Sequence, residues 1–165
     1  MIINHQQLVN YFSQLASNLN DINSFFRMDL TEIMGSFRSS AEFPCMVIES
    51  HEGDFGDSNR MQSVYNITWA FTIYTKPLKA DYTDQNLKLS TAEEIGIKLL
   101  ARMRHDATLP SHILYNRFKI ENVTCAKVGP VFNEQLYGYR FLGSIKVHQP
   151  LTVNTDDWAD SPTPC

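Results

Sequence analysis

The stretch VYNITWAFTIYT, residues 64–75, decides the fold. Successive side chains of a strand point to opposite faces, so an alternating pattern separates them into two sets. One set is large and apolar, Tyr65, Ile67, Trp69, Phe71 and Ile73, and the other is smaller and more polar, Asn66, Thr68, Ala70 and Thr72. Lys76-Pro77 ends the stretch, because proline cannot donate to a continuing ladder. We therefore predict a half-buried strand whose aromatic side is covered by other elements.

Helical periodicity predicts two amphipathic helices. The first covers about 5–22, is capped by Asn4, and has the apolar positions Leu8, Tyr11, Phe12, Leu15, Leu19 and Ile22. Its other side is rich in amides, which suits either solvent or contact with another protein. The second covers about 90–105 and begins at the capping box Ser90-Thr-Ala-Glu93. Its apolar face, Ala92, Ile95, Leu99 and Met103, is expected to cover the aromatic side of 64–75.

Three further strands are predicted from apolar runs and alternation. The first is 43–49, and the second is 115–127 with a bulge near Glu121-Asn122. A turn is expected at Gly129-Pro130, and alternation then predicts a long strand over 135–148.

The remaining segments are polar or ambiguous. Phe25, Phe26 and Met28 fit either a short strand or an apolar loop, and the D-x-x-E capping box at Asp29 predicts a brief helix through Phe37. The polar connection 50–63 joins two strands, so it is expected to form the loop at the tip of an extended, projecting β-hairpin. The segment 78–89 is expected to be a polar linker.

These elements predict an α+β fold: a mostly antiparallel four-stranded sheet with helices packed on one face, in the order α-(α)-β-β-α-β-β. A chain of 165 residues is long enough for one domain, which is placed at 1–150. Residues 151–165 have no periodic apolar face and are expected to form a flexible acidic tail, loose or docked through Trp158.

Composition excludes several classes of protein. A hydrophobic content of 43% and a charged content of 19% are ordinary for a folded chain, and a net charge of −4 argues against a general nucleic-acid binder. No run approaches the apolar length of a membrane span and no signal peptide is recognised, so a cytoplasmic protein without a membrane partner is expected. Cys45, Cys125 and Cys165 are expected to be reduced packing residues.

Motifs that carry chemistry are missing. Asp54-Phe55-Gly56 matches the kinase tripeptide without the other kinase signatures, and the five histidines form no HxxxH or HxH pair. Nucleophile elbows and nucleotide-binding loops are also missing, so no catalytic, cofactor-binding or metal residue is predicted and a binding or structural role is favoured over an enzyme. The alternative is a small metal- or ligand-binding α+β enzyme that uses the acidic residues of 49–57 with His51.

The element order carries a resemblance to a known family. It combines the Phe43-Pro44 strand start, the polar hairpin before 64–75, the helix TAEEIGIKLLARM, and Tyr137-Gly138-Tyr139-Arg140-Phe141 in the last strand. Over about 5–148 the chain resembles the tail-terminator and tail-completion proteins of tailed bacteriophages. The 23–42 insertion and the acidic tail depart from a simple match.

The resemblance implies a non-enzymatic virion protein, assembled in the host cytoplasm and located in the tail or neck. It would form a homo-oligomeric ring, usually a hexamer, that caps the tail tube and joins it to the head–neck complex. Its partners would be tail-tube and neck or connector proteins, and DNA would pass the channel without specific binding. An adaptor of a phage-tail-like secretion machine would look similar. The residues expected at interfaces are Phe25, Phe26, His51, Glu52, Asp54, Phe55, Asp57 and Arg60.

Overall fold

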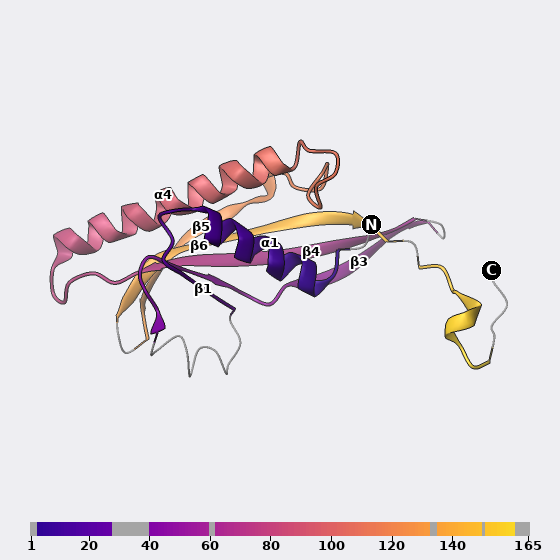
Figure 1. Cartoon of the computed structure of the whole chain (residues 1–165), viewed down its shortest axis with the longest axis horizontal. Helices are drawn as coiled ribbons and strands as arrows, with labels where there is room; N and C mark the ends of the chain where they lie inside the picture. Colours follow the sequence, from indigo (N-terminus) through magenta and orange to yellow (C-terminus); the bar gives the residue numbers. More distant parts are fainter. Residues whose placement is uncertain (1–2, 28–39, 60–61, 133–134, 150, 161–165) are drawn as a thin grey trace.

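The computed structural model describes residues 3–27, 40–59, 62–132, 135–149 and 151–160. The fold is α+β, as predicted (Figure 1). Its α-helices are α1 (His5–Asn18) and α4 (Tyr82–Asp106), with the short 3₁₀ helices η1 (Ile120–Asn122) and η2 (Thr155–Asp157). Its strands are β1 (Ser24–Arg27), β2 (Cys45–Ile48), β3 (Glu52–Asn59), β4 (Gln62–Thr75), β5 (Thr124–Val131) and β6 (Leu136–His148). The predicted helix at 29–37 lies outside the described residues.

The sheet has six strands and is mixed, which corrects the predicted four-stranded antiparallel sheet. The order is β1-β2-β4-β6-β5, and β3 also pairs with β4. β1 runs parallel to β2, whereas β4 pairs antiparallel with β2, β3 and β6. β2 pairs with the part of β4 near Phe71, and β3 pairs with the part near Tyr65. β2 and β3 therefore lie one after the other along the same edge of β4.

Most of the segment predicted as a polar loop at 50–63 is the strand β3. Its glycines and aspartates disfavour strands, so local propensity argued against this assignment. Pairing from Glu52↔Thr68 to Asn59↔Gln62 overrides that propensity and extends the hairpin with β4. The prediction of an extended hairpin is therefore supported, but β3 continues to Asn59 and β4 begins at Gln62, so most of the expected loop is strand; residues 60–61 lie outside the described part of the chain.

The two elements after β4 also differ from prediction. α4 begins at Tyr82, because the Asp81 carboxylate accepts a hydrogen bond of 2.9 Å from the Asp84 N–H. The predicted linker 78–89 is thus largely helical, and the predicted capping box at Ser90 lies inside the helix. The predicted strand 115–127 is mostly turns and η1; Phe118 forms only an isolated bridge with Ile145. β5 starts later, at Thr124, and continues through the predicted Gly129-Pro130 turn with a register shift there.

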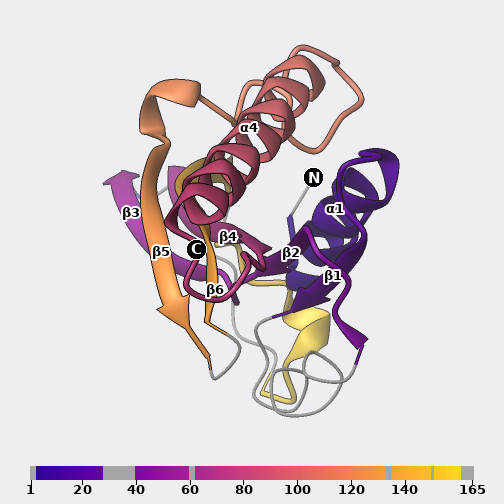
Figure 2. The same ribbon diagram turned by 90° about the vertical axis from the view of Figure 1, so that its left-hand side faces the viewer.

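Both helices pack on one face of the sheet, against the aromatic side of β4 (Figure 2). The side chains of Trp69, Phe71 and Ile73 are almost completely buried. Burial of each such side chain stabilises the fold by about 1.5–3 kcal/mol relative to exposure. The expected cover by the second helix is confirmed, and α1 shares it through Phe12, whose ring lies 5.6 Å from that of Trp69.

The opposite face of the sheet carries a smaller apolar cluster made by Cys45, Val47, Tyr74 and Leu136. Burial raises the pKa of the Cys45 thiol to about 12, so it stays protonated at neutral pH and packs as an apolar group. Cys125 is free and exposed on β5, which corrects its prediction as a packing residue.

The chain after β6 contains η2 and leaves Trp158 57% exposed in the described residues 151–160. In Figure 1 this segment extends away from the end of β6. Within the described chain, none of the helices combines the length and the apolar character that crossing a membrane requires.

Candidate functional site

The β3–β4 hairpin holds four of the eight residues predicted at interfaces. It extends past the ends of α1 and α4, so none of the described α-helices lies over this part of the sheet (Figure 1). Glu52 and Asp54 are exposed on β3, and Asn66 of β4 donates a hydrogen bond of 3.0 Å to the Asp54 carboxylate. Asp57 pairs with Ser63 in the same ladder, and Arg60 lies outside the described residues.

Phe55 gives the hairpin an apolar contact point. Its side chain is 56% exposed, and its ring stacks on Tyr65 of β4 with the centroids 4.6 Å apart. The Tyr65 ring also covers Gly53, where a Cβ atom would lie 2.1 Å from the tyrosine oxygen. Gly53 therefore allows this aromatic pair to lie flat on β3. An exposed aromatic side chain such as Phe55 on a projecting, acidic hairpin is a feature typical of protein interfaces.

His51 lies at the base of the hairpin and contacts the start of α1 instead of the acidic residues. Its Nδ1 atom lies 3.3 Å from Nδ1 of His5. Burial and the nearby charge of His5 lower the pKa of His51, so the neutral ring is favoured in the folded protein. A hydrogen bond between the two nitrogens then needs only one of them to carry a proton.

Phe25 and Phe26 lie on β1 and point to opposite faces of the sheet. Phe25 packs against the main core and Phe26 against the smaller cluster, and both are partly buried. β1 pairs with β2 from Ser24↔Cys45 to Arg27↔Ile48. The two phenylalanines therefore cover two separate parts of the core from the edge of the sheet.

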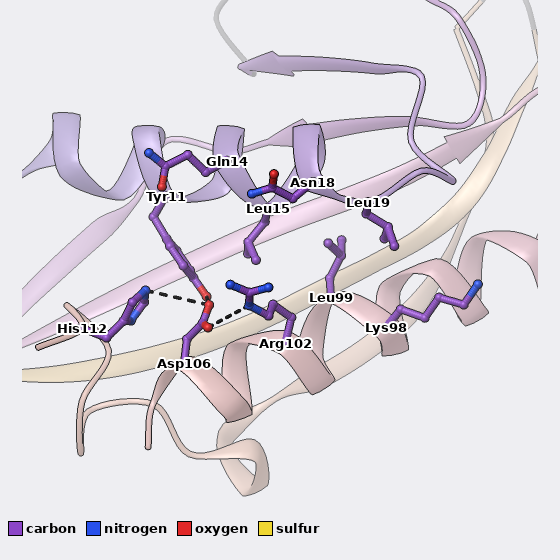
Figure 3. Close-up of a pocket in the computed structure, with 10 residues that line it drawn as sticks. All are labelled: Tyr11, Gln14, Leu15, Asn18, Leu19, Lys98, Leu99, Arg102, Asp106 and His112. Atoms are coloured by element: carbon purple, nitrogen blue, oxygen red, sulfur yellow. Dashed lines mark hydrogen bonds and ion pairs between the residues drawn. The ribbon is translucent and has the colours of Figure 1, made fainter. Parts of the chain in front are cut away.

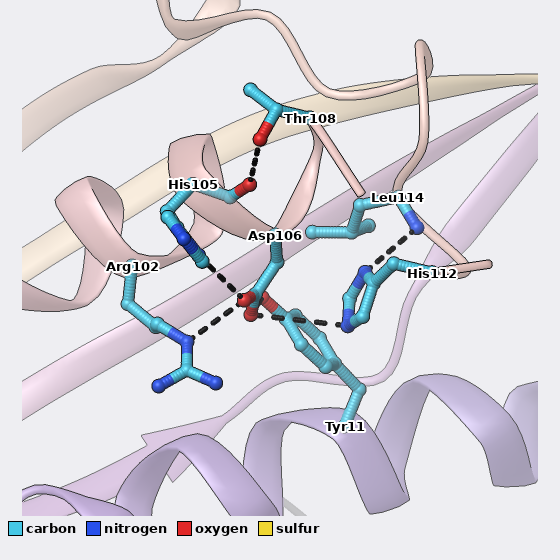
Figure 4. A network of polar contacts seen from close by, with 7 residues as sticks. All are labelled: Tyr11, Arg102, His105, Asp106, Thr108, His112 and Leu114. Carbon is cyan, nitrogen blue, oxygen red and sulfur yellow. Dashed lines mark hydrogen bonds and ion pairs between the residues drawn. The ribbon is translucent and has the colours of Figure 1, made fainter. Parts of the chain in front are cut away.

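Sequence reasoning missed a buried polar cluster at the end of α4. Asp106 is 2% exposed, and its carboxylate accepts hydrogen bonds from the Tyr11 hydroxyl at 3.0 Å and from Arg102 Nε at 2.8 Å (Figure 4). His105 Nδ1 lies 3.5 Å from the same carboxylate, and His112 Nε2 lies 3.8 Å from it. The cluster thus joins α1, α4 and the loop that follows α4.

The cluster keeps Asp106 ionised. Burial by itself raises the pKa of this carboxyl, but the hydrogen bonds from Arg102, Tyr11 and His105 outweigh it, and the net pKa is lowered. Burial and the adjacent charge of Asp106 raise the pKa of Tyr11 well above its usual value, so the phenol remains a donor. A signal was present in the sequence, since Asp106 continues the spacing of Leu99 and Met103 on the apolar face of the helix.

The His112 ring is held by contacts at both of its nitrogens. The backbone N–H of Leu114 donates to His112 Nδ1 at 3.2 Å, so the proton of the neutral ring is on Nε2, which faces Asp106. With Nδ1 already accepting and Nε2 protonated, the imidazole has no lone pair for a substrate proton. General-base catalysis needs such a lone pair within reach of the substrate, and His112 in this arrangement does not present one.

A pocket of about 190 Å³ lies between α1 and α4 beside this cluster (Figure 3). Its walls combine apolar side chains such as Leu15 and Leu99 with the amides of Gln14 and Asn18. Lys98 on its rim forms an exposed ion pair of 2.6 Å with Asp21. Ligand sites of drug size usually occupy about 300–1,000 Å³, so this pocket is small for one.

Glu49 and Asp54 interact with different partners on different strands. Glu49 forms a bidentate ion pair with Arg140, at 2.5 and 2.7 Å, whereas Asp54 interacts with Asn66. Among the residues that the structure describes, no group of three His, Cys, Asp or Glu side chains is placed to hold a metal ion. The geometry therefore gives no support to an ion site at the base of the hairpin.

Comparison with known proteins found no family model that matches the chain and no match among curated proteins.

Proposed function

We propose that the chain is a structural virion protein: a ring-forming tail terminator or tail-completion factor that caps the tail tube and joins it to the head–neck complex. The proposal follows the resemblance described above. The observation that carries it is the β3–β4 hairpin, which extends beyond the helices and exposes Glu52, Asp54 and Phe55 (Figure 1).

The packing of the chain suits this role. A ring component must be rigid where it contacts its neighbours, and α1 and α4 both pack on the sheet that carries the hairpin. A hairpin held by a long ladder can then present polar and aromatic groups to a stacked ring. If the hairpins line the channel, their acidic residues repel phosphate, and DNA passes without specific binding.

The test measures assembly and tube capping separately. The purified chain is studied by light scattering coupled to size exclusion and by electron microscopy, first alone and then with tail tubes of its phage. We expect rings, alone or on the tube, and a density that closes one end of each tube. Only monomers, together with open tube ends, would contradict the proposal. Binding to the tube of a secretion machine instead would identify the adaptor alternative.

A charge-reversal variant locates the contact. Glu52→Lys with Asp54→Lys is expected to weaken tube capping by at least tenfold, because like charges replace complementary ones at the hairpin. The matched control is Glu94→Lys with Glu121→Lys, which changes the net charge equally at exposed positions outside the hairpin. Equal capping by the two variants would remove the hairpin from the proposed interface.

A further inference from the structure

The outer sides of β3 and β5 are open in the described part of the chain. β3 pairs only with β4 and β5 only with β6 in the described part of the chain. No backbone hydrogen bond between described residues involves the outer side of either strand. Each strand has eight residues. A row of unpaired N–H and C=O groups of this length is a template for pairing with another chain.

The usable part of each edge is shorter than the strand. The register of β5 shifts between Val128 and Val131, around Pro130, which cannot donate a hydrogen bond. The register of β3 shifts between Asp57 and Asn59. Regular pairing is thus confined to 124–128 of β5 and 52–57 of β3. Thr124 to Lys127 are exposed, so no described element covers the edge of β5.

The directions of the two edges are complementary. β3 is antiparallel to β4, β4 is antiparallel to β6, and β6 is antiparallel to β5. β3 and β5 therefore run in opposite directions on opposite sides of the sheet. A second copy placed alongside in the same orientation would pair its β3 antiparallel with β5 of the first. A contact that joins two different surfaces in this way generates rings or filaments.

Charge favours this pairing over the two symmetric ones. The charged residues of β3 are Glu52, Asp54 and Asp57, all acidic, and the charged residue of β5 is Lys127. Pairing β3 with a second β3 sets acidic residues against each other, and pairing β5 with a second β5 sets lysine against lysine. Like charges directly opposite each other in a sheet are destabilising. Pairing β3 with β5 avoids both repulsions, since Lys127 lies on the helix side of the sheet and Glu52 and Asp54 lie on the other side.

We propose that β5 of one copy pairs antiparallel with β3 of the next copy and continues the sheet from subunit to subunit. The occupant of each open edge is therefore a second copy of this chain. The inference rests on the proposed ring and identifies the contact that closes it. The pairing also places Phe55, next to the outer edge of β3, against the neighbouring subunit.

Disulfide trapping tests the pairing, because strands opposite each other bring residues of the same face together. Cys125 pairs with Phe141, on the helix side of the sheet, and Phe55 pairs with Tyr65 on that same side. Asp54 pairs with Asn66, on the other side. In a Cys165→Ser background, Phe55→Cys is expected to cross-link to Cys125 of a neighbour on oxidation, and Asp54→Cys is expected to cross-link at least tenfold less.

The reciprocal variants provide the control. Cys125→Ser with Ala126→Cys moves the thiol of β5 to the other face, since Ala126 pairs with Arg140. Asp54→Cys should then cross-link and Phe55→Cys should not. The products should form a ladder on a non-reducing gel that ends at the ring number.

Light scattering on the same samples separates the possible failures. Rings that show no face-dependent cross-links would contradict the edge pairing but not the proposed ring. Monomers without cross-links would overturn both the pairing and the proposed function. A ladder that stops at the dimer would contradict a head-to-tail ring.

Discussion

The substitution Gly96→Ala distinguishes local propensity from tertiary packing. Gly96 lies inside α4, where alanine is more favourable by about 1 kcal/mol on helix propensity alone. In the folded protein, however, a Cβ atom at Gly96 would lie 2.0 Å from Cε2 of Phe141. Ordinary contacts between carbon atoms are about 3.5–4.0 Å, so the ring or the helix would have to move by roughly 1.5 Å.

The Phe141 ring has little room to move. It is 1% exposed and stacks on Phe71 with the centroids 5.1 Å apart. Overpacking of a well-packed core costs about 1–3 kcal/mol, and a displacement of this size belongs at the upper end. Subtracting the propensity gain of about 1 kcal/mol leaves an expected loss of about 2 kcal/mol in the free energy of unfolding.

Urea denaturation followed by circular dichroism measures this loss. Ser90→Ala is the matched control, because Ser90 is exposed on the same helix and its replacement should raise stability by a few tenths of a kcal/mol. Phe141→Leu removes the ring atoms that clash, so Gly96→Ala should be less harmful in that background. If Gly96→Ala stabilises the protein as Ser90→Ala does, the close packing of α4 on β6 is refuted.

Two further predictions concern the polar cluster at the end of α4. Tyr11→Phe removes the hydrogen bond to the Asp106 carboxylate and should lower the free energy of unfolding by about 1.5–3 kcal/mol, measured by urea denaturation; an unchanged midpoint would contradict the contact. The pKa of Asp106 is lower in the folded protein than in the unfolded chain. The contribution of Asp106 to the free energy of unfolding is therefore complete above the pKa of the unfolded chain, and it disappears as the pH falls through the pKa of the folded protein. The stability gap between the natural chain and Asp106→Asn should therefore narrow from pH 7 towards pH 2 in thermal scans, and parallel curves would contradict this linkage.

Strong periodic patterns in the sequence predicted the correct elements. β4, β6 and α1 appear close to their expected positions, since each has an apolar side whose spacing matches only one secondary structure. The helix predicted at 90–105 is also present, but it begins eight residues earlier, at Tyr82, where Asp81 caps it. The sequence did not indicate this start, because the first turn of the helix is polar and has no apolar periodicity. Local patterns therefore identified elements that bury a face and missed segments that do not.

The candidate site was predicted only in part for the same reason. The hairpin residues Glu52, Asp54 and Phe55 were expected at a projecting tip and lie on the exposed hairpin. The cluster around Asp106 was missed because its members lie far apart in the sequence; Tyr11 and Asp106 are separated by 95 positions. Such a cluster exists only after α1 and α4 have packed on the same face.

The sequence by itself determined which stretches have a buried side, because alternation and helical spacing are local properties of the chain. It thereby determined the α+β class and the helix-covered aromatic face of β4. Only the tertiary structure decided that a glycine- and aspartate-rich segment becomes β3, that β1 adds in parallel, and that the outer sides of β3 and β5 remain open in the described chain. Those features depend on hydrogen bonds to strands distant in sequence, and a backbone N–H or C=O group has no sequence signature of its own.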